Sequence, residues 1–536
     1  MSKTSDTRHE PGRALRHTFR TAFCGNLAEP REAVAALEDT GWTARSDSPP
    51  ALLPQDIDAW NADPFHDRNW RFQLHAWRPI DPYVVAHDLT GEAAYLDRAI
   101  VVMRSWEAAE SASDDDALYW NDMGSGLRSA KLAYLVDRLA PDHPDRDWVI
   151  ALSRRHLARL RDESFYSTSN HGLFQVHGAV ALLNALPDAP EAADGQPFAE
   201  RMLDRILDHQ FGQECVHLEH SPGYHLFVIT ILRRMIASGW YGHMPHLHDI
   251  VARAREALPW MIFPDGLLPG VGDTERVQAG ARKPKDADDG VHGRLFREAG
   301  YAVVRSGFKT RRQDASMLFV TGGHHSMVHK HADDLSFEWF ERGRMWIVDT
   351  GKYTYSKADW RAFTNSARAH NSIDLTRARP NNGLSVTPPA GGLLTDLRRN
   401  GRFWEIEGRL DRPAIGARHH RLFRYLPGRR LTLIDTIDLD QPGEVTAWLH
   451  LAPRLEVEAR EDGWRFRGGR ITYEVEGAEV SLVRARGQTG PDLQGWYAEA
   501  YHQITENDAV GARLTGRTIR LVTVITLADK KVPAKP

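Results

Sequence analysis

HHSMVHKHADDLSFEWFERGRMWIVDTGKYTYSKADWRAFTNSARAHN, residues His324 to Asn371, encodes a β-hairpin set among histidines and acidic residues. The segments LSFEWF and RMWIVD alternate well enough for paired strands, and the ERG between them can form the turn. Folding the chain about this turn brings Asp349 opposite about Leu335, a few residues from His331. The stretch therefore predicts two paired strands that bring an acidic residue close to a histidine.

A metal site is one interpretation of this stretch. His331, Asp349 and the later His370 form a set of nitrogen and oxygen ligands that suits zinc. If the segment around His329 and His331 is extended, both side chains point to one face, so that one could bind metal while the other faces a ligand. The alternative is a hydrogen-bonded polar cluster without metal.

Helices dominate the chain before this stretch, from about residue 30 to 275. Segments with apolar residues at helical spacing follow one another there, with Thr90 as an N-cap of one of them. The loops between them are short and carry Pro, Gly, Asp or Asn. Successive helices of similar length predict an α/α array, either a solenoid or a closed toroid.

Strands dominate the chain after a polar, charged segment that begins near residue 276. They are evenly spaced and separated by turn signals, which predicts an antiparallel sandwich. We therefore expect an α+β multidomain protein. Its helical domain would cover residues 31–290 and its antiparallel β-sandwich residues 291–536, with residues 1–30 as a disordered tail or a first helix.

Composition is typical of an ordinary globular protein, with 42% apolar and 26% charged residues, and 536 residues are too many for one compact core. The net charge of -4 provides no global basic field that would recruit nucleic acid, so an anionic partner must meet a local basic site. Cys24 and Cys215 are the only cysteines, which excludes a disulfide framework and fits a reducing compartment.

Targeting signals are not visible in the sequence. The N-terminal segment lacks the apolar core of a secretory signal, and no stretch reaches about 18 uninterrupted apolar residues. We expect a protein without a membrane span that acts in the cytoplasm, with the periplasm as the alternative. The oligomeric state is left open.

Polar motifs in the helical half supply further candidates. Asn170 and His171 lie where a helix begins, and backbone N–H groups there favour an anion such as a carboxylate. The other interpretation is a simple N-cap with a packed histidine. In EHSPGYH, the Pro-Gly pair forces a turn before Tyr224 and His225, and a tyrosine there usually serves packing or hydrogen bonding.

Aromatic and basic residues also occur together in NWRFQLHAW and YWNDMGSGLRSA. They would suit a wall that binds sugar rings, or they form an aromatic helix interface. Arg368 adds positive charge near the hairpin, although a solvated surface is the default interpretation for a single arginine. The candidate substrate-binding residues are Trp70, Arg71, Trp120, Arg128, His225 and Arg368.

Several of these motifs together resemble the heparinase II/III group of polysaccharide lyases, which includes alginate lyases of similar build. The resemblance covers residues 60 to 450, and its most specific parts are SNHG, EHSPGYH and the segments HKHADDLSF, VDTGKYTY and RAHNS. NWRFQLHAW, LPGVGDTE and GYAVVRSG also look like family segments. The resemblance implies an incomplete α/α toroid joined to an antiparallel β-sandwich, and β-elimination on a uronate-containing acidic glycan.

Site residues follow from the resemblance by position. Asn170 and His171 match residues that neutralise the substrate carboxylate, Tyr224 matches the catalytic tyrosine, and His329 matches a catalytic histidine. Tyr355 is a candidate second tyrosine. The set that matches zinc ligands in members with a mainly structural metal is His331, Asp349 and His370. The absence of the export signal common in secreted members puts a nutrient-scavenging role in doubt.

β-Elimination explains these residue types. The proton next to the uronate carboxylate is weakly acidic, so hydrogen-bond donors must stabilise the negative charge that grows in the transition state. A base then takes the proton and an acid protonates the departing oxygen; Tyr224 could do both, or His329 could supply the base. The alternatives are a glycoside hydrolase, for which Glu219, Asp122 and Asp333 are available carboxylates, and a non-catalytic glycan-binding or capsule-pathway protein.

Overall fold

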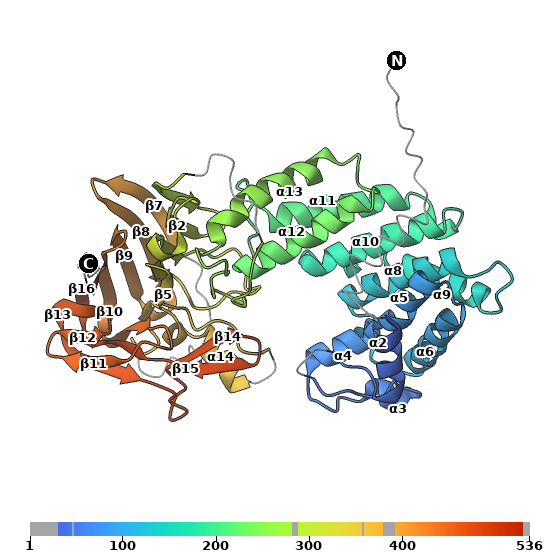
Figure 1. The fold of residues 1–536 in the computed structure, drawn as a ribbon, viewed down its shortest axis with the longest axis horizontal. Coiled ribbons are helices and arrows are strands. Elements are labelled where there is room, and N and C mark those ends of the chain that lie inside the picture. Colours follow the sequence, from blue (N-terminus) through green and yellow to red (C-terminus); the bar gives the residue numbers. More distant parts are fainter. Residues whose placement is uncertain (1–29, 45–47, 281–287, 356–357, 379–391, 529–536) are drawn as a thin grey trace, which may run out of the picture. The chain divides into compact units, whose positions relative to one another are not determined.

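The structure, a computed structural model, describes residues 30–44, 48–280, 288–355, 358–378 and 392–528 (Figure 1). Its contacts divide the chain into two compact units. We call residues 1–210 and 228–251 the helical unit, and residues 211–227 and 252–536 the strand-rich unit. The predicted tail or first helix over residues 1–30 lies outside the described residues except for its last position. The predicted domain boundaries stay a prediction.

Helices of 4 to 18 residues make up the helical unit. They are α2 (Pro30–Asp39), α3 (Ile57–Asn61), α4 (Arg68–His75), α5 (Asp81–Thr90), α6 (Ala94–Ser111), α7 (Asp116–Tyr119), α8 (Asp122–Arg138), α9 (Arg146–Arg159), α10 (Asn170–Ala185) and α11 (Gly195–Gln210), with most of α12 (Pro222–Ala237) and α13 (Pro245–Ala257). Within the described residues, no helix is both long and apolar enough to span a membrane.

Two glycines allow α8 and α10 to pack backbone against backbone. A Cβ atom on Gly126 would lie 2.2 Å from the carbonyl oxygen of Phe174, and one on Gly178 would lie 2.3 Å from the carbonyl oxygen of Gly126. Both helices are buried along most of their length. This close crossing fixes the position of α10, whose first turn carries Asn170 and His171.

Antiparallel strands form most of the strand-rich unit (Figure 1). One sheet has the order β1 (Val291–Phe296), β2 (Tyr301–Ser306), β3 (Ser316–Thr321), β4 (Phe337–Glu341) and β5 (Arg344–Ile347). The larger sheet has the order β11 (Val457–Arg460), β12 (Gly463–Phe466), β13 (Gly469–Ala485), β16 (Ala509–Leu527), β10 (Arg430–His450), β9 (Ala417–Leu426), β8 (Phe403–Arg412) and β7 (Leu393–Asn400), with β6 (Ile373–Asp374) pairing with β10. β14 (Trp496–Ala500) pairs with β15 (Gln503–Glu506), and the short helix α14 (Ala358–Asn365) follows β5.

The two larger sheets pack face to face through aromatic side chains. The rings of Phe337 and Phe423 are 5.7 Å apart, and those of Trp339 and Tyr425 are 6.5 Å apart. Side chains of β9 alternate between buried and exposed along the strand, as expected when one face of a sheet covers a core. The predicted antiparallel β-sandwich is confirmed.

The predicted hairpin is also confirmed, with a shifted register. β4 and β5 pair around the turn at Arg342 and Gly343, and both turn residues have positive φ angles of 54° and 88°. A bulge between Trp339 and Phe340 pairs Trp339 with Ile347. Asp349 therefore does not lie opposite Leu335, as the symmetric fold of the hairpin predicted; its backbone N–H instead donates to Glu338 Oε1 at 3.2 Å.

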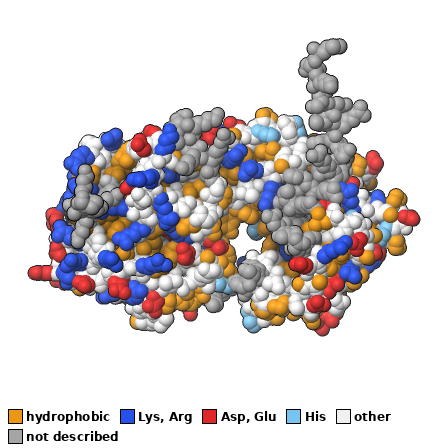
Figure 2. Space-filling view, viewed as in Figure 1, with side chains coloured by type: hydrophobic (Ala, Val, Ile, Leu, Met, Phe, Trp, Pro, Cys, Tyr) orange, Lys and Arg blue, Asp and Glu red, His pale blue; other side chains and the backbone are white. Residues whose placement is uncertain are grey.

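A buried arginine joins the large sheet to the loops next to the hairpin. Arg421 on β9 pairs with Asp435 on β10, with a distance of 2.6 Å between Nε and Oδ1. Its Nη1 donates to the carbonyl oxygens of Leu335 and Asn371, each at 2.8 Å. Arg421 therefore holds two loop segments against the sheet. Lys and Arg side chains are frequent on the surface of the strand-rich unit (Figure 2).

Candidate active site

Tyr224 lies in the first turn of α12, within the strand-rich unit. Pro222 opens the helix, a position at which proline is favoured because its missing N–H is not needed there. Ser221 Oγ accepts from the N–H of Tyr224 at 3.3 Å and shares a hydrogen bond of 2.7 Å with Thr274 Oγ1. The N–H of Gly223 donates to the same Thr274 oxygen at 3.1 Å. The predicted EHSPGYH turn is therefore tied to the segment around Thr274.

His329 and Tyr355 lie against Tyr224. The rings of Tyr224 and His329 are stacked, with centroids 3.5 Å apart and planes 20° apart. The hydroxyl oxygens of Tyr224 and Tyr355 are 3.3 Å apart, within hydrogen-bond distance. The structure thus brings together the two predicted tyrosines and the predicted catalytic histidine.

Asp273 is the centre of this cluster and is not among the residues predicted from the sequence. Its Oδ2 is 2.9 Å from His329 Nδ1 and its Oδ1 is 3.1 Å from His331 Nε2. The Arg361 guanidinium binds both oxygens of the carboxylate. His329 has a φ of 56°, so the backbone is not extended at this residue, yet His329 and His331 still converge on the one carboxylate.

A signal for Asp273 was present in the glycines around it. Gly272 has a φ of 54°, and a Cβ atom there would lie 2.3 Å from the carbonyl oxygen of His220 and 2.9 Å from that of His329. A glycine that admits so close a backbone approach marks a loop packed against the site. The quoted segment LPGVGDTE contains this loop, but nothing in the sequence distinguishes its acidic residues from one another.

The hydrogen bonds fix the charge of Asp273. Burial alone would raise the pKa of its carboxyl, but hydrogen bonds from His329 and His331, together with Arg361, hold that pKa well below the usual value. The ionised carboxylate accepts the Nδ1–H of His329, so the other ring nitrogen, Nε2, carries the lone pair in neutral imidazole. Asp273 therefore selects the tautomer of His329 that presents a basic Nε2.

The two tyrosines differ in acidity. Burial raises the pKa of Tyr224 to about 12, while the hydrogen bond from Tyr355 acts in the opposite direction. Removal of its hydroxyl from water raises the pKa of Tyr355 further, with Asp273 adding to the effect. Tyr355 and Tyr224 thus share a hydrogen bond, and both phenols keep their protons at neutral pH.

Cations surround Tyr355. The Arg361 guanidinium lies 5.0 Å from the centre of its ring, and Lys352 Nζ also lies 5.0 Å from that centre. Lys352 is paired with Glu275 at 2.9 Å. The phenols therefore lie beside positive charge that is already balanced by Asp273 and Glu275.

Glu219 and His225 are the first and the last polar residue of the EHSPGYH segment. Glu219 Oε2 is 3.6 Å from His329 Nε2, and the residue is 4% exposed. His225 is fully buried; its Nδ1 accepts from the N–H of His217 at 3.1 Å, and its Nε2 donates to the carbonyl oxygen of Ala254 at 3.0 Å. With both nitrogens bound to backbone, His225 is placed to shape the turn, and the structure does not support its predicted role in substrate binding.

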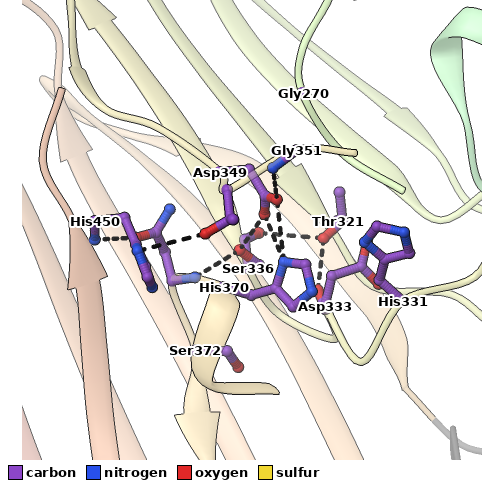
Figure 3. A network of polar contacts seen from close by, with 12 residues as sticks. Gly270, Thr321, His331, Asp333, Ser336, Asp349, Gly351, His370, Ser372 and His450 are labelled. Atoms are coloured by element: carbon purple, nitrogen blue, oxygen red, sulfur yellow. Dashed lines mark hydrogen bonds and ion pairs between the residues drawn. The ribbon is translucent and has the colours of Figure 1, made fainter. Parts of the chain in front are cut away.

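The predicted metal ligands are also close together (Figure 3). Asp349 binds His370, with 2.9 Å between Oδ2 and Nδ1, and the rings of His331 and His370 have centroids 5.4 Å apart. His331 Nδ1 and His370 Nε2 are buried and have no hydrogen-bond partner among the described residues, so each suits a metal ion. Asp349, in contrast, uses both oxygens for His370 and also accepts from Gly351 and Ser336.

The fit to zinc is therefore partial. No group of three or more His, Cys, Asp or Glu side chains within the described ranges is arranged to hold a metal ion. The ligand set His331, Asp349 and His370 stays a prediction.

Asn170 and His171 lie in the helical unit, at the start of α10. Ser169 is the N-cap, and its Oγ accepts from the N–H of His171 at 3.3 Å, which confirms a helix start at the predicted place. Asn170 is 5% exposed. The His171 side chain is 42% exposed, and its Nδ1 is 3.1 Å from Asp122 Oδ1. Their predicted role toward a substrate carboxylate stays a prediction.

The predicted sugar-binding wall in the helical unit consists largely of packed side chains. Arg128 is fully buried; it donates to His156 Nε2 at 3.0 Å, and its guanidinium lies 4.4 Å from the centre of the Trp106 ring. Trp70 and Trp120 are 4% and 8% exposed. The structure favours the alternative, an aromatic helix interface.

The two remaining candidates for substrate binding are only partly accessible. Arg71 is half-buried, and its role is not decided by its contacts. Arg368, in the strand-rich unit, pairs with Asp492 at 2.8 Å. Neither placement excludes contact with a ligand, and both roles stay predictions.

Two sequence profiles match the chain almost end to end. The heparinase II/III N-terminus matches residues 28–286, and the heparinase II/III-like C-terminal domain matches residues 288–528. The chain belongs to the heparinase II/III family. It is thus a polysaccharide lyase by family, as the motifs predicted.

Individual relatives agree with this family. A heparin-sulfate lyase of Bacteroides stercoris is 21% identical over 537 residues, which is 89% of this chain and 77% of that protein. A crystal structure of heparinase III superposes with a TM-score of 0.75 at 15% identity, covering 98% of this chain and 90% of the other. A heparan sulfate lyase of Pedobacter heparinus gives 0.66 at 15% identity, covering 98% and 88%. The shared fold is the predicted incomplete toroid followed by a β-sandwich.

Proposed function

We propose that this chain cleaves a uronate-containing acidic glycan of the glycosaminoglycan class by β-elimination and leaves a 4,5-unsaturated uronate. The observation that supports this most is the stack of Tyr224 on His329, with Asp273 bound behind the histidine. It pairs a protonated phenol with an imidazole whose Nδ1 is bound to Asp273, while its Nε2 lies on the other side of the ring, 3.6 Å from Glu219 Oε2. An elimination needs an acid and a base within reach of the reacting atoms of the substrate.

The base is His329 and the acid is Tyr224 in this mechanism. His329 Nε2 takes the proton from the carbon next to the uronate carboxylate, and the ionised Asp273 stabilises the imidazolium that forms. Tyr224, whose pKa is about 12, donates its proton to the departing glycosidic oxygen. Tyr355 then supports the Tyr224 phenolate through the hydrogen bond between their oxygens.

The charge that grows on the substrate carboxylate also needs stabilisation. Asn170 and His171 are the residues proposed for it, because they match the family positions for this task and lie at a helix N-terminus, which favours negative charge. Donors of this kind act mainly on the transition state, so they lower the barrier more than they tighten binding.

A glycoside hydrolase is less well supported. Its general acid needs a carboxyl with a raised pKa. Burial by itself would raise the pKa of Asp333, but Lys330 and nearby histidines lower that pKa to about 2. The pKa of Asp122 is likewise lowered by His171, against the effect of burial. Neither of these two carboxyls is suited to donate a proton at neutral pH, and the third candidate, Glu219, lies beside His329 without a second carboxyl of the predicted set.

The experiment that tests the function is incubation with heparan sulfate, heparin, alginate, hyaluronan and chondroitin sulfate. Elimination on any of them gives ultraviolet absorbance from the unsaturated uronate, and mass spectrometry identifies that product as well as endo or exo action. Chain cleavage without ultraviolet absorbance would exclude elimination. Binding without cleavage of any of the five would favour the glycan-binding alternative.

We also propose a structural zinc ion held by His331 and His370, with Asp349 orienting or joining them. Its support is the pair of buried ring nitrogens, His331 Nδ1 and His370 Nε2, that have no hydrogen-bond partner in the described part of the chain. When bound, zinc would brace the segment that carries His329. Elemental analysis of protein purified without chelator should find about one zinc per chain, and His331→Ala should lose the metal and lower the melting temperature together. Wild-type protein without zinc would refute the site.

The place of action is the cytoplasm in our proposal, with the periplasm as the alternative. Its support is the small number of cysteines, two in 536 residues. Fractionation of the native host followed by immunodetection decides between the two compartments.

A further inference from the structure

A broad groove lined by arginines lies on the strand-rich unit, at strands of the large sheet. It has a volume of about 1810 Å³. Three carboxylates line it, from Glu456, Glu458 and Asp462, against ten arginines. The arginines are Arg402, Arg429, Arg430, Arg454, Arg460, Arg465, Arg467, Arg470, Arg484 and Arg486. The groove is strongly basic in a chain whose net charge is -4.

The strand register places three of these arginines in one row. Arg465 on β12 is directly opposite Arg470 on β13, and both Arg470 and Arg430 are opposite Thr526 on β16. Residues directly opposite one another share a face of the sheet, and like charges in that arrangement destabilise it. An anion lying across the row would remove this repulsion.

Several of the guanidinium groups are available for such an anion. Within the part of the chain that the structure describes, no ion pair occupies Arg402, Arg454, Arg465, Arg467 or Arg470, and these five are exposed. By contrast, Arg460 pairs with Glu458 and Arg484 pairs with Asp508. The unpaired arginines concentrate at the β12–β13 hairpin and its surroundings. Figure 2 shows Lys and Arg side chains gathered in the region where Figure 1 places these strands.

Aromatic residues of the groove indicate which anion it suits. Trp464 and Phe466 are 5% and 4% exposed, so they offer no flat surface for stacking bases. The Phe403 ring is already covered by Arg424 and Arg430, at 4.5 Å and 5.7 Å from its centre. The groove presents several arginine guanidinium groups, which are planar and bind sulfate and carboxylate groups through two parallel hydrogen bonds.

We propose that this arginine groove is a second binding site for the acidic glycan chain, separate from the site that cleaves it. The two sites share none of their residues. The choice of a glycan as the polyanion rests on the proposed function. A long chain held in the groove stays near the catalytic residues between cleavage events, which raises its effective concentration there.

The test uses two triple variants of the full-length chain. Arg465→Gln/Arg467→Gln/Arg470→Gln removes three charges from the groove. Arg409→Gln/Arg418→Gln/Arg517→Gln removes the same number from exposed positions on β8, β9 and β16 that do not line the groove. Because all six side chains are exposed, both variants should melt within a degree or two of the wild type.

Binding to immobilised heparin and to long heparan sulfate chains is measured at several salt concentrations. We expect the groove variant to elute from heparin at clearly lower salt and to bind long chains about tenfold more weakly, as the loss of three exposed charge pairs would give. The control variant should behave like the wild type. On polymer the groove variant should raise KM at unchanged kcat, whereas turnover of a tetrasaccharide should not change.

Three results would overturn the proposal. The groove variant could bind heparin as the wild type does, both variants could weaken binding equally, or duplex DNA could bind the groove as tightly as heparin at equal salt. The binding measurements do not need catalysis. A wild type that cleaves no glycan but binds heparin through the groove would therefore refute the proposed function alone.

Discussion

At the scale of single residues, the hydroxyl of Tyr224 is the group with the most specific task. Tyr224→Phe keeps the ring that stacks on His329 and removes only the oxygen that Tyr355 approaches at 3.3 Å. We expect kcat to fall by about 10²- to 10⁴-fold, the usual contribution of a general acid, with an unchanged melting temperature. Tyr501 is a neighbouring tyrosine outside the stack, and the Tyr501→Phe variant should keep most of the wild-type activity. Near-normal turnover of the Tyr224 variant would remove it from the mechanism.

The pH dependence tests the role of Tyr224 as acid. Because burial raises its pKa to about 12, the phenol is protonated and active below that value, and activity is lost only as the pH rises toward it. We expect kcat to stay level from neutral pH to about pH 10. Replacing Tyr224 with a fluorinated tyrosine of lower pKa should move the alkaline loss to lower pH. An alkaline limb near pH 8 in the wild type would contradict this assignment.

Asp273 acts through His329 and does not itself take part in proton transfer. In Asp273→Asn the side chain can offer an N–H to Nδ1, which favours the tautomer with its proton on Nε2 and removes the base. We expect kcat to fall on the order of 10²- to 10⁴-fold with little change in KM. Steady-state kinetics and a circular dichroism spectrum like that of the wild type would support this role. A raised KM with an unchanged kcat would contradict this role.

Among the elements, the close crossing of α8 and α10 leads us to expect that a glycine-to-alanine substitution in a helix lowers the stability of the protein. Alanine normally stabilises a helix interior by about 1 kcal/mol relative to glycine. At Gly126, however, the added Cβ would lie 2.2 Å from a carbonyl oxygen of α10, so Gly126→Ala should lower the melting temperature. Gly124 in the same helix is the matched control, because its Cβ would find nothing closer than 3.4 Å. Gly124→Ala should be neutral or stabilising, and equal melting temperatures for both variants would contradict the crossing.

The Arg421–Asp435 pair makes the corresponding prediction for the sandwich. Arg421→Met leaves Asp435 buried without its main partner and should cost about 3–5 kcal/mol in the free energy of unfolding. Burial by itself would raise the pKa of the Asp435 carboxyl, but Arg421 and His419 lower that pKa to about 2. The folded pKa lies below the unfolded value, so the pair stabilises above about pH 4 and loses this effect as the pH falls toward 2. Urea unfolding should show the gap between wild type and variant narrow over that interval, and a constant gap would contradict it.

The features of the fold and of the site that could be predicted are those that depend on residues close together in the sequence. The hairpin after Leu335 and the helix start at Asn170 depend on alternation and capping within a few residues, and both are where the sequence predicts them. The bulge at Trp339 depends on packing and was missed. Asp273 was missed because its role depends on contacts with residues 56, 58 and 88 positions away. The burial of Arg128 could not be predicted, because sequence does not distinguish an arginine packed among aromatic rings from one that faces a ligand.

At the scale of the whole molecule, charge is distributed unevenly. A net charge of -4 correctly excludes a basic field over the whole chain, but it conceals ten arginines around one groove. The net charge predicts that an anionic partner must meet a local basic site, but it does not say where that site lies. The arginines come from four stretches of the chain, at residues 402, 429–430, 454–470 and 484–486, and only the strand register brings Arg430, Arg465 and Arg470 into one row.

The interleaving of the two compact units limits how such a protein can be recombined. Residues 211–227 and 252–290 precede the strands in sequence but belong to the strand-rich unit, so a cut at the junction of the two family profiles separates Tyr224 and Asp273 from His329 and Tyr355. Exchange of C-terminal halves between relatives would combine Tyr224 and Asp273 from one parent with His329 and Tyr355 from another, which divides both the ring stack and the hydrogen bond behind it. Such chimaeras should be inactive unless the loop and turn that carry Tyr224 and Asp273 travel with the strands, which makes these short segments part of one inherited catalytic module.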